Sequence, residues 1–295
     1  MQKLSPIGLV GLGLVGSALG SRLVSARYPV LGYDIAPAAC QKARVIGVRT
    51  VPDLKTLGSA CNLIFLSLPN GSVVKEVLRK KGDLVSGCQR GTVILDTSTI
   101  YPEDTLQLSK ELSTQGVFLI DAPLVGSSEE IADGQGIMLV GTSSQNAWFK
   151  EVLECLVRKV HFLGKVGSAH CAKLVINLIL GANRLVLAEG LALAQKSGIN
   201  PIEFLDVLRD SAAYSRVMDT KGPRMCAGRF EPPAARLAQH AKDVGLILKL
   251  GRSTKARTPV SRLHHRLLRE AIRKGWGELD NSAIVKVFLD LEKNT

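Results

Sequence analysis

The sequence predicts an α/β domain with a mostly parallel, doubly wound sheet, followed by an all-α domain that opens with one long helix. In the first 164 residues, short apolar or β-branched runs alternate with segments whose apolar residues recur at helical intervals. From Gly167 onward the strand signals end, and residues 168–197 form one long, mostly apolar helical segment. A length of 295 residues is typical of two domains, so we expect them at residues 1–164 and 165–295.

Short apolar runs define the expected strands, and the segments between them define the expected helices. The strands are Pro6–Val10, Val30–Tyr33, Asn62–Leu68, Thr92–Asp96, Phe118–Ala122, Gly136–Val140 and Val160–Leu163. The helices of the first domain are 15–26, 36–46, 72–80, 102–115 and 145–157. The later helices of the second domain are 201–210, 215–227, 234–250, 259–274 and 281–293. Prolines stand near several of these helix starts, where proline is tolerated.

The composition excludes several classes of protein. Apolar residues make up 46% of the chain and charged residues 22%, which excludes disordered and collagen-like chains. Six cysteines without a CxxC motif or a Cys/His cluster predict scattered buried thiols in a reducing compartment, and no metal site. Glycines within the N-terminal apolar run argue against a secretory signal. Polar residues interrupt the apolar stretch Leu174–Ala194, so we expect no membrane span and a cytoplasmic protein.

The positive charge is concentrated in the second half of the chain. The net charge of +12 divides into +2 for residues 1–164 and +10 for residues 165–295. Four arginines recur at helical spacing on one face, at Arg262, Arg266, Arg269 and Arg273. Such a face can bind nucleic acid or simply be solvated. The absence of interleaved aromatic residues favours the solvated face, so we expect no nucleic-acid partner.

A glycine-rich loop follows the first expected strand and reads Gly11-Leu12-Gly13-Leu14-Val15-Gly16. In this GxGxxG pattern the first glycine allows a tight turn, the second lets the backbone approach a pyrophosphate, and the third lets the helix pack closely on the strand. The amino terminus of the following helix provides free N–H groups for that phosphate. The loop therefore predicts a Rossmann dinucleotide-binding domain.

Asp34 ends the second expected strand, 18 residues beyond Gly16. A carboxylate at this place accepts hydrogen bonds from the adenosine ribose and repels a 2′-phosphate, which favours NAD over NADP. By itself, Asp34 could equally be a helix N-cap before Ala36.

Further motifs follow in order along nearly the whole chain. They are Leu68-Pro69-Asn70, Asp96-Thr97-Ser98-Thr99-Ile100 with Pro102, Asp121-Ala122-Pro123, Gly164-x-x-Gly167-x-Ala169-x-x-x-Lys173-x-x-x-Asn177, Lys242-Asp243 and Asp280-x-Ser282-Ala283. With these motifs the chain resembles the β-hydroxyacid dehydrogenase family, which includes 3-hydroxyisobutyrate dehydrogenase and tartronate semialdehyde reductase and is related to 6-phosphogluconate dehydrogenase. The resemblance implies cofactor contacts at Leu68, Pro69, Thr99 and Lys242, and a catalytic role for Lys173.

Two positions depart from the pattern of that family. The usual D-A-P-V-S-G-G reads here Asp121-Ala122-Pro123-Leu124-Val125-Gly126-Ser127, so that Val125 replaces the serine and Ser127 a glycine. Ala169 stands where a glycine is usual. The first change affects the loop that holds the substrate carboxylate in the family, so the identity of the substrate stays open.

The chemistry of an alcohol and a carbonyl requires a group that accepts and returns a proton, since the nicotinamide carries only the hydride. Lys173 is our candidate, because the positive end of the helix and a nicotinamide cation both disfavour its charged form. Asn177 lies one turn later and can hold the substrate hydroxyl or orient the amine. We expect a structural or merely polar role for His170, a surface position for His264-His265, and a solvated loop at Glu129-Glu130.

We expect the substrate anion to bind the backbone N–H groups and hydroxyls of Gly126, Ser127 and Ser128, beside Val125, with Asn177 and Arg236 nearby. The leading hypothesis is an NAD-dependent oxidoreductase that interconverts a small β-hydroxy acid and its semialdehyde. One alternative is a reductase for a sulfonate or sugar-acid substrate. Another is a non-catalytic module that binds nucleic acid. The long apolar helix and the resemblance imply a homodimer or homotetramer.

Overall fold

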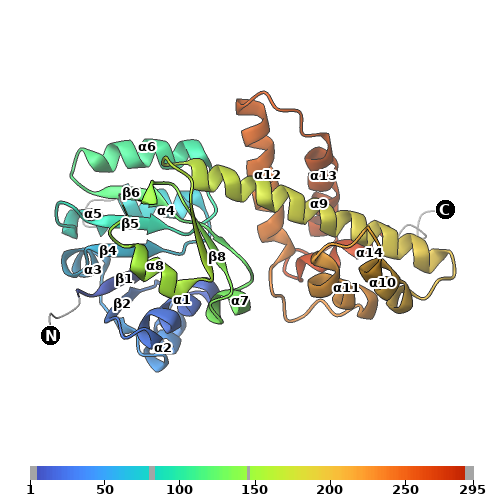
Figure 1. Ribbon diagram of the computed structural model, residues 1–295, viewed down its shortest axis with the longest axis horizontal. Helices are drawn as coiled ribbons and strands as arrows, with labels where there is room; N and C mark the ends of the chain where they lie inside the picture. The colour runs from blue at the N-terminus through green and yellow to red at the C-terminus, as the bar shows by residue number, and fades with distance from the viewer. Residues whose placement is uncertain (1–4, 80–83, 145–146, 290–295) are drawn as a thin grey trace. The chain divides into compact units, whose positions relative to one another are not determined.

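Figure 1 shows the computed structural model, which describes residues 5–79, 84–144 and 147–289. The chain divides into two compact units, Met1–Lys173 and Leu174–Thr295. This division falls inside a continuous helix, whereas the sequence placed the domain boundary after residue 164. The fold class is confirmed: a parallel α/β unit precedes a helical unit that contains one long helix.

A six-stranded parallel sheet forms the centre of the first unit, in the order β3-β2-β1-β4-β5-β6. Its strands are β1 (Ile7–Val10), β2 (Val30–Tyr33), β3 (Arg49–Thr50), β4 (Leu63–Leu66), β5 (Val93–Asp96) and β6 (Phe118–Asp121). Five of these match expected strands. Strand β3 was missed because two residues show no alternation that a sequence pattern can detect.

A second sheet of three strands departs from the predicted arrangement. It contains β7 (Leu124–Val125), β8 (Ile137–Val140) and β9 (Lys159–Phe162), and β7 pairs with β8 in the antiparallel sense. Only Ala122 and Pro123 separate β6 from β7. A parallel return to the same sheet needs a crossover of a dozen or more residues, so β7 turns away from the first sheet.

Helices cover both faces of the large sheet. They are α1 (Leu14–Ser25), α2 (Pro37–Val45), α3 (Leu54–Ala60), α4 (Gly71–Arg79), α5 (Leu84–Gly87), α6 (Pro102–Ser113), α7 (Ser128–Ala132) and α8 (Lys150–Leu156). The sequence analysis missed the short helices α3, α5 and α7. Residue 80 and residues 145–146 of the expected helices lie outside the described residues.

Alternate residues of each strand supply two separate cores. Leu9 and Phe65 pack with the α1 and α8 side of the sheet, whereas Ile64 and Ile94 pack with the α3 and α6 side. Both faces of a parallel sheet are buried in this way, which explains why its strands read as continuous apolar runs.

The second unit is helical and is built around most of the length of α9. Its helices are α9 (Ser168–Lys196), α10 (Pro201–Asp210), α11 (Val217–Ala227), α12 (Leu237–Ser253), α13 (Pro259–Arg273), the 3-10 helix η2 (Asn281–Ile284) and α14 (Val285–Leu289). Leu174, Leu185 and Leu187 of α9 join the core of this unit. The single helix expected at 281–293 is instead η2 followed by α14, and residues 290–293 lie outside the described part of the chain.

One described helix, α9, has the length and apolar composition of a membrane-spanning segment. Part of its surface belongs to the core described above. Another part is exposed and carries Val175, Ile179, Val186 and Leu193. These positions are separated by four or seven residues, so they lie along one side of the helix.

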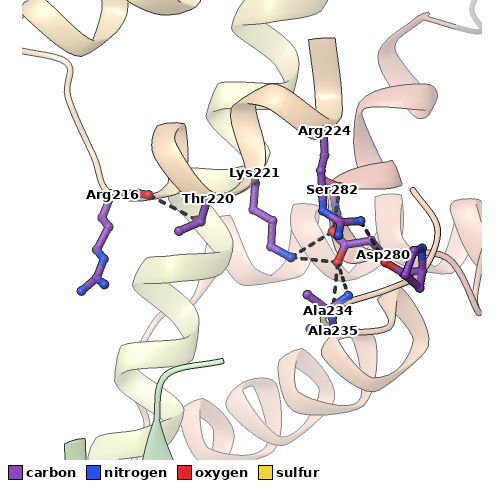
Figure 2. A network of polar contacts seen from close by, with 9 residues as sticks. Arg216, Thr220, Lys221, Arg224, Ala234, Ala235, Asp280 and Ser282 are labelled. Carbon is purple, nitrogen blue, oxygen red and sulfur yellow. Dashed lines mark hydrogen bonds and ion pairs between the residues drawn. The ribbon is translucent and has the colours of Figure 1, made fainter. Parts of the chain in front are cut away.

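The carboxylate of Asp280 organises the end of the second unit (Figure 2). It is fully buried and accepts hydrogen bonds from the ammonium group of Lys221 at 2.9 and 2.8 Å. It also accepts the backbone N–H groups of Ala234 and Ala235 and the hydroxyl of Ser282. Burial by itself would raise the pKa of Asp280, but the bonds from Lys221 and Ser282 outweigh burial and hold it at about 2. One carboxylate thus joins α11, the segment before α12, and η2.

This network predicts a pH-dependent stability. Because the folded pKa of Asp280 lies below its ordinary value of 3.8, the ionised group stabilises the fold above about pH 4. This stabilisation, roughly 2 kcal/mol, is lost as the pH falls from about 4 to about 2. Asp280→Asn should lower the free energy of unfolding at neutral pH by about 3 kcal/mol, because it leaves the buried ammonium group without its counterion. In this variant the free energy of unfolding should also depend less on pH in the acid range.

Urea unfolding followed by circular dichroism between pH 7 and pH 3 measures both effects. Asp210→Asn is the matched control, because Asp210 is exposed in the same unit. Equal pH profiles for the native protein and Asp280→Asn would contradict the assignment.

Candidate active site

The glycine loop connects β1 to α1 and has the backbone shape that its sequence predicts. Gly11 has φ +90°, a left-handed conformation that favours glycine, and a Cβ there would collide with the carbonyl oxygen of Ser67. A Cβ on Gly16 would collide with the carbonyl oxygen of Gly11. At Gly13, by contrast, a Cβ would meet no atom of the protein within 4 Å. The first and third glycines are therefore required by the fold, whereas the space beside the second is open to a ligand.

Asp34 supports this loop from the end of β2. Its Oδ2 accepts the backbone N–H of Leu12 at 2.7 Å, and its Oδ1 accepts that of Ala36 at 2.8 Å. The buried Leu12 therefore uses its N–H within the protein. The N-cap position of α2 is Ala36, so Asp34 is not the N-cap. Leu14 and Val15 are the first two residues of α1, directly after Gly13.

A cavity of about 620 Å³ opens beside Asp34. Tyr33, Ile35, Pro37, Arg44 and Pro52 are among its other lining residues. It lies past the carboxyl end of β2, on the far side of the loop from β4. Its polar lining combines a carboxylate with the guanidinium group of Arg44, whose Nε donates to the hydroxyl of Thr50 at 2.6 Å.

The segments that follow β4 and β5 are joined to each other. The backbone N–H of Leu68 donates to the hydroxyl of Ser98 at 3.0 Å, which links the Leu68-Pro69 turn to the segment that contains Thr99. The N–H of Ser98 donates in turn to Asp96 at 2.9 Å. Burial raises the pKa of the Asp96 carboxyl, against the opposing influence of His170 and Ser98. Thus Leu68, which the sequence assigned to the cofactor together with Pro69 and Thr99, is hydrogen-bonded to Ser98, the residue directly before Thr99.

The amino terminus of α9 is held by Asp121 at the end of β6. The two carboxylate oxygens of Asp121 accept the backbone N–H groups of Gly167 and His170, each at 2.8 Å. The His170 ring is fully buried and contacts the Thr105 hydroxyl at 2.7 Å and the Ser98 carbonyl oxygen at 3.0 Å. The structural role expected for His170 is therefore the one that the structure shows. Lys173 follows it by one turn and is half-buried.

In the second unit, Asn177 contacts the Lys242-Asp243 pair. The side-chain amide of Asn177 donates to Asp243 at 3.0 Å, and the ammonium group of Lys242 lies 3.1 Å from the other oxygen of the same carboxylate. The sequence analysis placed Asn177 and Lys242 among the site residues but omitted Asp243, although the Lys-Asp motif contains it. Asp243 is the group that joins them.

The loop at Val125–Ser128, which the sequence analysis assigned to the substrate anion, contacts the carboxylate of Glu130. Ser127 is the N-cap of α7, and its hydroxyl accepts the N–H of Glu130 at 3.1 Å, while Glu130 accepts the N–H of Ser127 at 2.8 Å. This reciprocal pair is a capping box, so Glu130 is not the solvated loop residue that the sequence predicted. The N–H of Ser127 is therefore already used. The loop retains the exposed Gly126, with half-buried Val125 and Ser128 beside it.

Other predicted residues lie elsewhere. Arg236 is exposed, pairs with Glu278 at 3.2 Å, and stands at the N-cap of α12. The surface position expected for His264 is wrong: its side chain is buried beside the ring of His240, with 5.1 Å between the ring centroids. Burial, then Arg184 and His265, lowers the pKa of His264 to about 4. Within the described residues, no cluster of three potential metal ligands is found.

Comparisons with known proteins agree with this fold. Residues 6–164 match a family model described as the NAD binding domain of 6-phosphogluconate dehydrogenase. Residues 167–288 match one described as NAD-binding of NADP-dependent 3-hydroxyisobutyrate dehydrogenase. A dinucleotide-binding fold followed by a helical unit, matched by these two models, defines a class of nicotinamide-dependent oxidoreductases. The chain belongs to the β-hydroxyacid dehydrogenase family and is a dehydrogenase of the 3-hydroxyisobutyrate dehydrogenase type.

Individual relatives span nearly the full chain. It is 30% identical to 2-(hydroxymethyl)glutarate dehydrogenase of Eubacterium barkeri over 98% of this chain and 96% of that protein. The crystal structure of 3-hydroxyisobutyrate dehydrogenase from Salmonella typhimurium has the same fold, with a TM-score of 0.87 and 22% identity over 96% of this chain and 99% of that one. Psf3 in complex with NADP+ and 2-OPP also shares the fold, with a TM-score of 0.86 and 22% identity over 95% and 99% of the two chains.

The open space at Gly13 leads to a specific prediction. Gly13→Ala should leave the fold and the Tm nearly unchanged, because the added methyl group meets no protein atom. It should weaken NAD binding by about tenfold or more, because the methyl group occupies the space through which the pyrophosphate approaches. Quenching of tryptophan fluorescence on titration with NAD measures the Kd. Gly190→Ala, at a second open glycine, is the control, and an unchanged Kd in Gly13→Ala would place the dinucleotide elsewhere.

Proposed function

We propose that this dehydrogenase interconverts a small β-hydroxy acid and its semialdehyde with NAD, and that Lys173 is the acid/base. The observation that supports this most strongly is the anchored start of α9. Asp121 ties that helix to the end of β6, while Leu68, Ser98 and Thr99 form the neighbouring strand ends of the same unit. An amine that follows one turn later on a fixed helix can be kept in one place relative to a bound nicotinamide.

The dinucleotide fits the residues that are present. Gly11 and Gly16 permit the tight loop, Gly13 leaves room for a phosphate, and α1 begins with no acidic residue in its first turn. When bound, the nicotinamide supplies hydride chemistry, accepting or donating the hydride at the substrate carbon. The protein must then move one proton at the substrate oxygen.

Lys173 performs that proton transfer in this proposal. In the oxidation direction its neutral amine takes the proton of the hydroxyl group, and in reduction the ammonium group returns it to the carbonyl oxygen. Asn177, one turn further along α9, orients the reacting groups through its amide. Its bond to Asp243 limits the rotation of that amide, and Asp243 also holds the ammonium group of Lys242.

Binding of the substrate anion is assigned to the loop at Val125–Ser128, with a changed set of donors. Because Glu130 already accepts the N–H of Ser127, we assign the contact to the Gly126 and Ser128 N–H groups and to the Ser127 hydroxyl, which can still donate its proton. The relative from Eubacterium barkeri acts on a hydroxymethyl dicarboxylic acid, by its name. A hydroxy acid is therefore preferred to a sulfonate. A sugar acid stays an alternative, because a relative from Cupriavidus necator is named L-threonate dehydrogenase.

The assignment of Arg236 to the substrate is not carried into this proposal, because its pairing with Glu278 already explains its position. A non-catalytic role is also set aside, since the chain belongs to a family of dehydrogenases.

We further propose that the protein is a cytoplasmic homo-oligomer. The exposed apolar side of α9, with Val175, Ile179, Val186 and Leu193, favours contact with a second copy of the chain. A helix packed in this way needs no membrane to cover it. Sedimentation equilibrium at several protein concentrations measures the oligomeric state.

Lys173→Ala tests the proposed reaction. Turnover should fall by ~10²–10⁴-fold, because the proton has no acceptor, while the Kd for NAD stays nearly unchanged. The assay follows NADH formation over a panel of short β-hydroxy acids that includes 3-hydroxyisobutyrate. Lys165→Ala, an exposed lysine shortly before α9, is the control. If Lys173→Ala keeps more than about half of the native kcat, Lys173 is not the acid/base.

Asp34 should make the enzyme prefer NAD. Its carboxylate faces the cavity beside β2 and would repel a 2′-phosphate. The native kcat/KM should therefore be higher with NAD than with NADP. Asp34→Ala combined with Ile35→Arg should reduce or reverse this difference in kcat/KM between NAD and NADP. Ile35→Arg alone is the control, because the Ile35 side chain is 89% exposed. A native preference for NADP would contradict this role of Asp34.

A further inference from the structure

The buried ring of His170 has a defined protonation pattern. Its Nε2 lies 3.0 Å from the carbonyl oxygen of Ser98, which can only accept a hydrogen bond, so Nε2 carries the proton. Its Nδ1 lies 2.7 Å from the hydroxyl of Thr105. In the neutral ring, Nδ1 accepts the hydroxyl proton of Thr105. Both ring nitrogens are therefore used, and the imidazole cannot rotate without losing two buried hydrogen bonds.

The backbone at His170 is held as firmly as the ring. Its N–H donates to the fully buried carboxylate of Asp121 at 2.8 Å, beside the bond from Gly167. Hydrogen bonds to a carboxylate are shorter and stronger than those between neutral groups. The first turn of α9 is thus bound to three places in the first unit: the end of β6, helix α6 through Thr105, and the segment after β5 through Ser98.

The same contacts lead to the segments assigned to the cofactor. Ser98 uses its carbonyl oxygen for His170 and its hydroxyl for the N–H of Leu68. Thr99 is the next residue after Ser98, and Lys173 follows His170 by three residues on the same side of α9. One buried imidazole therefore lies between the segments assigned to the nicotinamide and the helical turn that carries the proposed acid/base.

We propose that His170 is a positioning residue for Lys173, acting with Thr105 and Ser98 to fix the amine relative to the Leu68–Thr99 segments. This inference rests on the proposed role of Lys173. It assigns no proton transfer to His170, whose ring is closed off from substrate by burial. A displacement of about 1 Å at a reacting group can lower a rate by about 10²-fold, so loosening this turn should reduce kcat.

Three variants test the proposal. His170→Ala removes both ring contacts, and Thr105→Val removes only the hydroxyl while retaining the shape of the side chain. Thr105→Ser restores the hydroxyl. His161→Ala, at a half-buried histidine of β9, is the matched control. Circular dichroism and Tm are measured for each variant beside kcat, KM and the Kd for NAD.

We expect kcat to fall by about tenfold or more in His170→Ala and by about threefold or more in Thr105→Val. The Kd for NAD should stay within about twofold, and Thr105→Ser should restore most of the native kcat. This separation of kcat from cofactor binding is not expected if the histidine merely stabilises the fold. Because Thr105→Val keeps the buried ring, it remains informative even if His170→Ala does not fold.

Two results would overturn the proposal. One is a kcat within twofold of native in Thr105→Val and in folded His170→Ala. The other is a parallel loss of kcat and NAD affinity that Thr105→Ser does not restore, since that pattern indicates a general loss of structure. A failure of the proposed function is a different outcome, because it would appear as activity retained in Lys173→Ala.

Discussion

The carboxylate of Asp121 is the contact on which the geometry of the candidate site depends. It is buried at the end of β6 and accepts two backbone N–H groups from the start of α9. These donors belong to the positive end of a helix of 29 residues, so the buried charge is balanced by a helix dipole as well as by hydrogen bonds. Without this carboxylate, the turn before Lys173 would have unsatisfied N–H groups in an apolar environment. The same two hydrogen bonds fix the position of the helical turn that precedes Lys173.

The parallel sheet positions the other segments of the candidate site. In the order β3-β2-β1-β4-β5-β6, strands β1 to β3 extend toward one edge of the sheet and β4 to β6 toward the other, so the strand order reverses between β1 and β4. Ligands of such folds bind outside the carboxyl ends of the strands at this place, because the helices on either side diverge there. The glycine loop after β1 and the Leu68 turn after β4 flank it. Asp34 connects the loop to β2, and Ser98 connects the turn to the segment after β5.

The loop after β7 shows how a local preference can modify a family pattern. Ser127 and Glu130 satisfy each other's backbone N–H groups, which is a favourable way to begin the short helix α7. The same pairing places a carboxylate against the loop assigned to the substrate anion. In the proposed site, a substrate carboxylate would meet fewer free donors and a neighbouring carboxylate.

Much of this protein follows from its sequence alone. The alternation of apolar runs with helical segments determined the parallel α/β fold, since strand and helix periodicities are local properties of the chain. The GxGxxG loop and Asp34 were found because a tight turn needs glycines at fixed spacing. The short elements β3, β7, α3, α5 and α7 were missed, because a few residues carry too little periodicity to be recognised.

Only the tertiary structure decided which polar groups satisfy one another. His170 meets Thr105 and Ser98 across 65 and 72 residues of sequence, and Asn177 meets Asp243 across 66. The buried position of His264 and the joining role of Asp280 depend on similar distant contacts. No local pattern encodes these pairings. They arise because most buried polar atoms find a partner among the groups that chain folding brings near them.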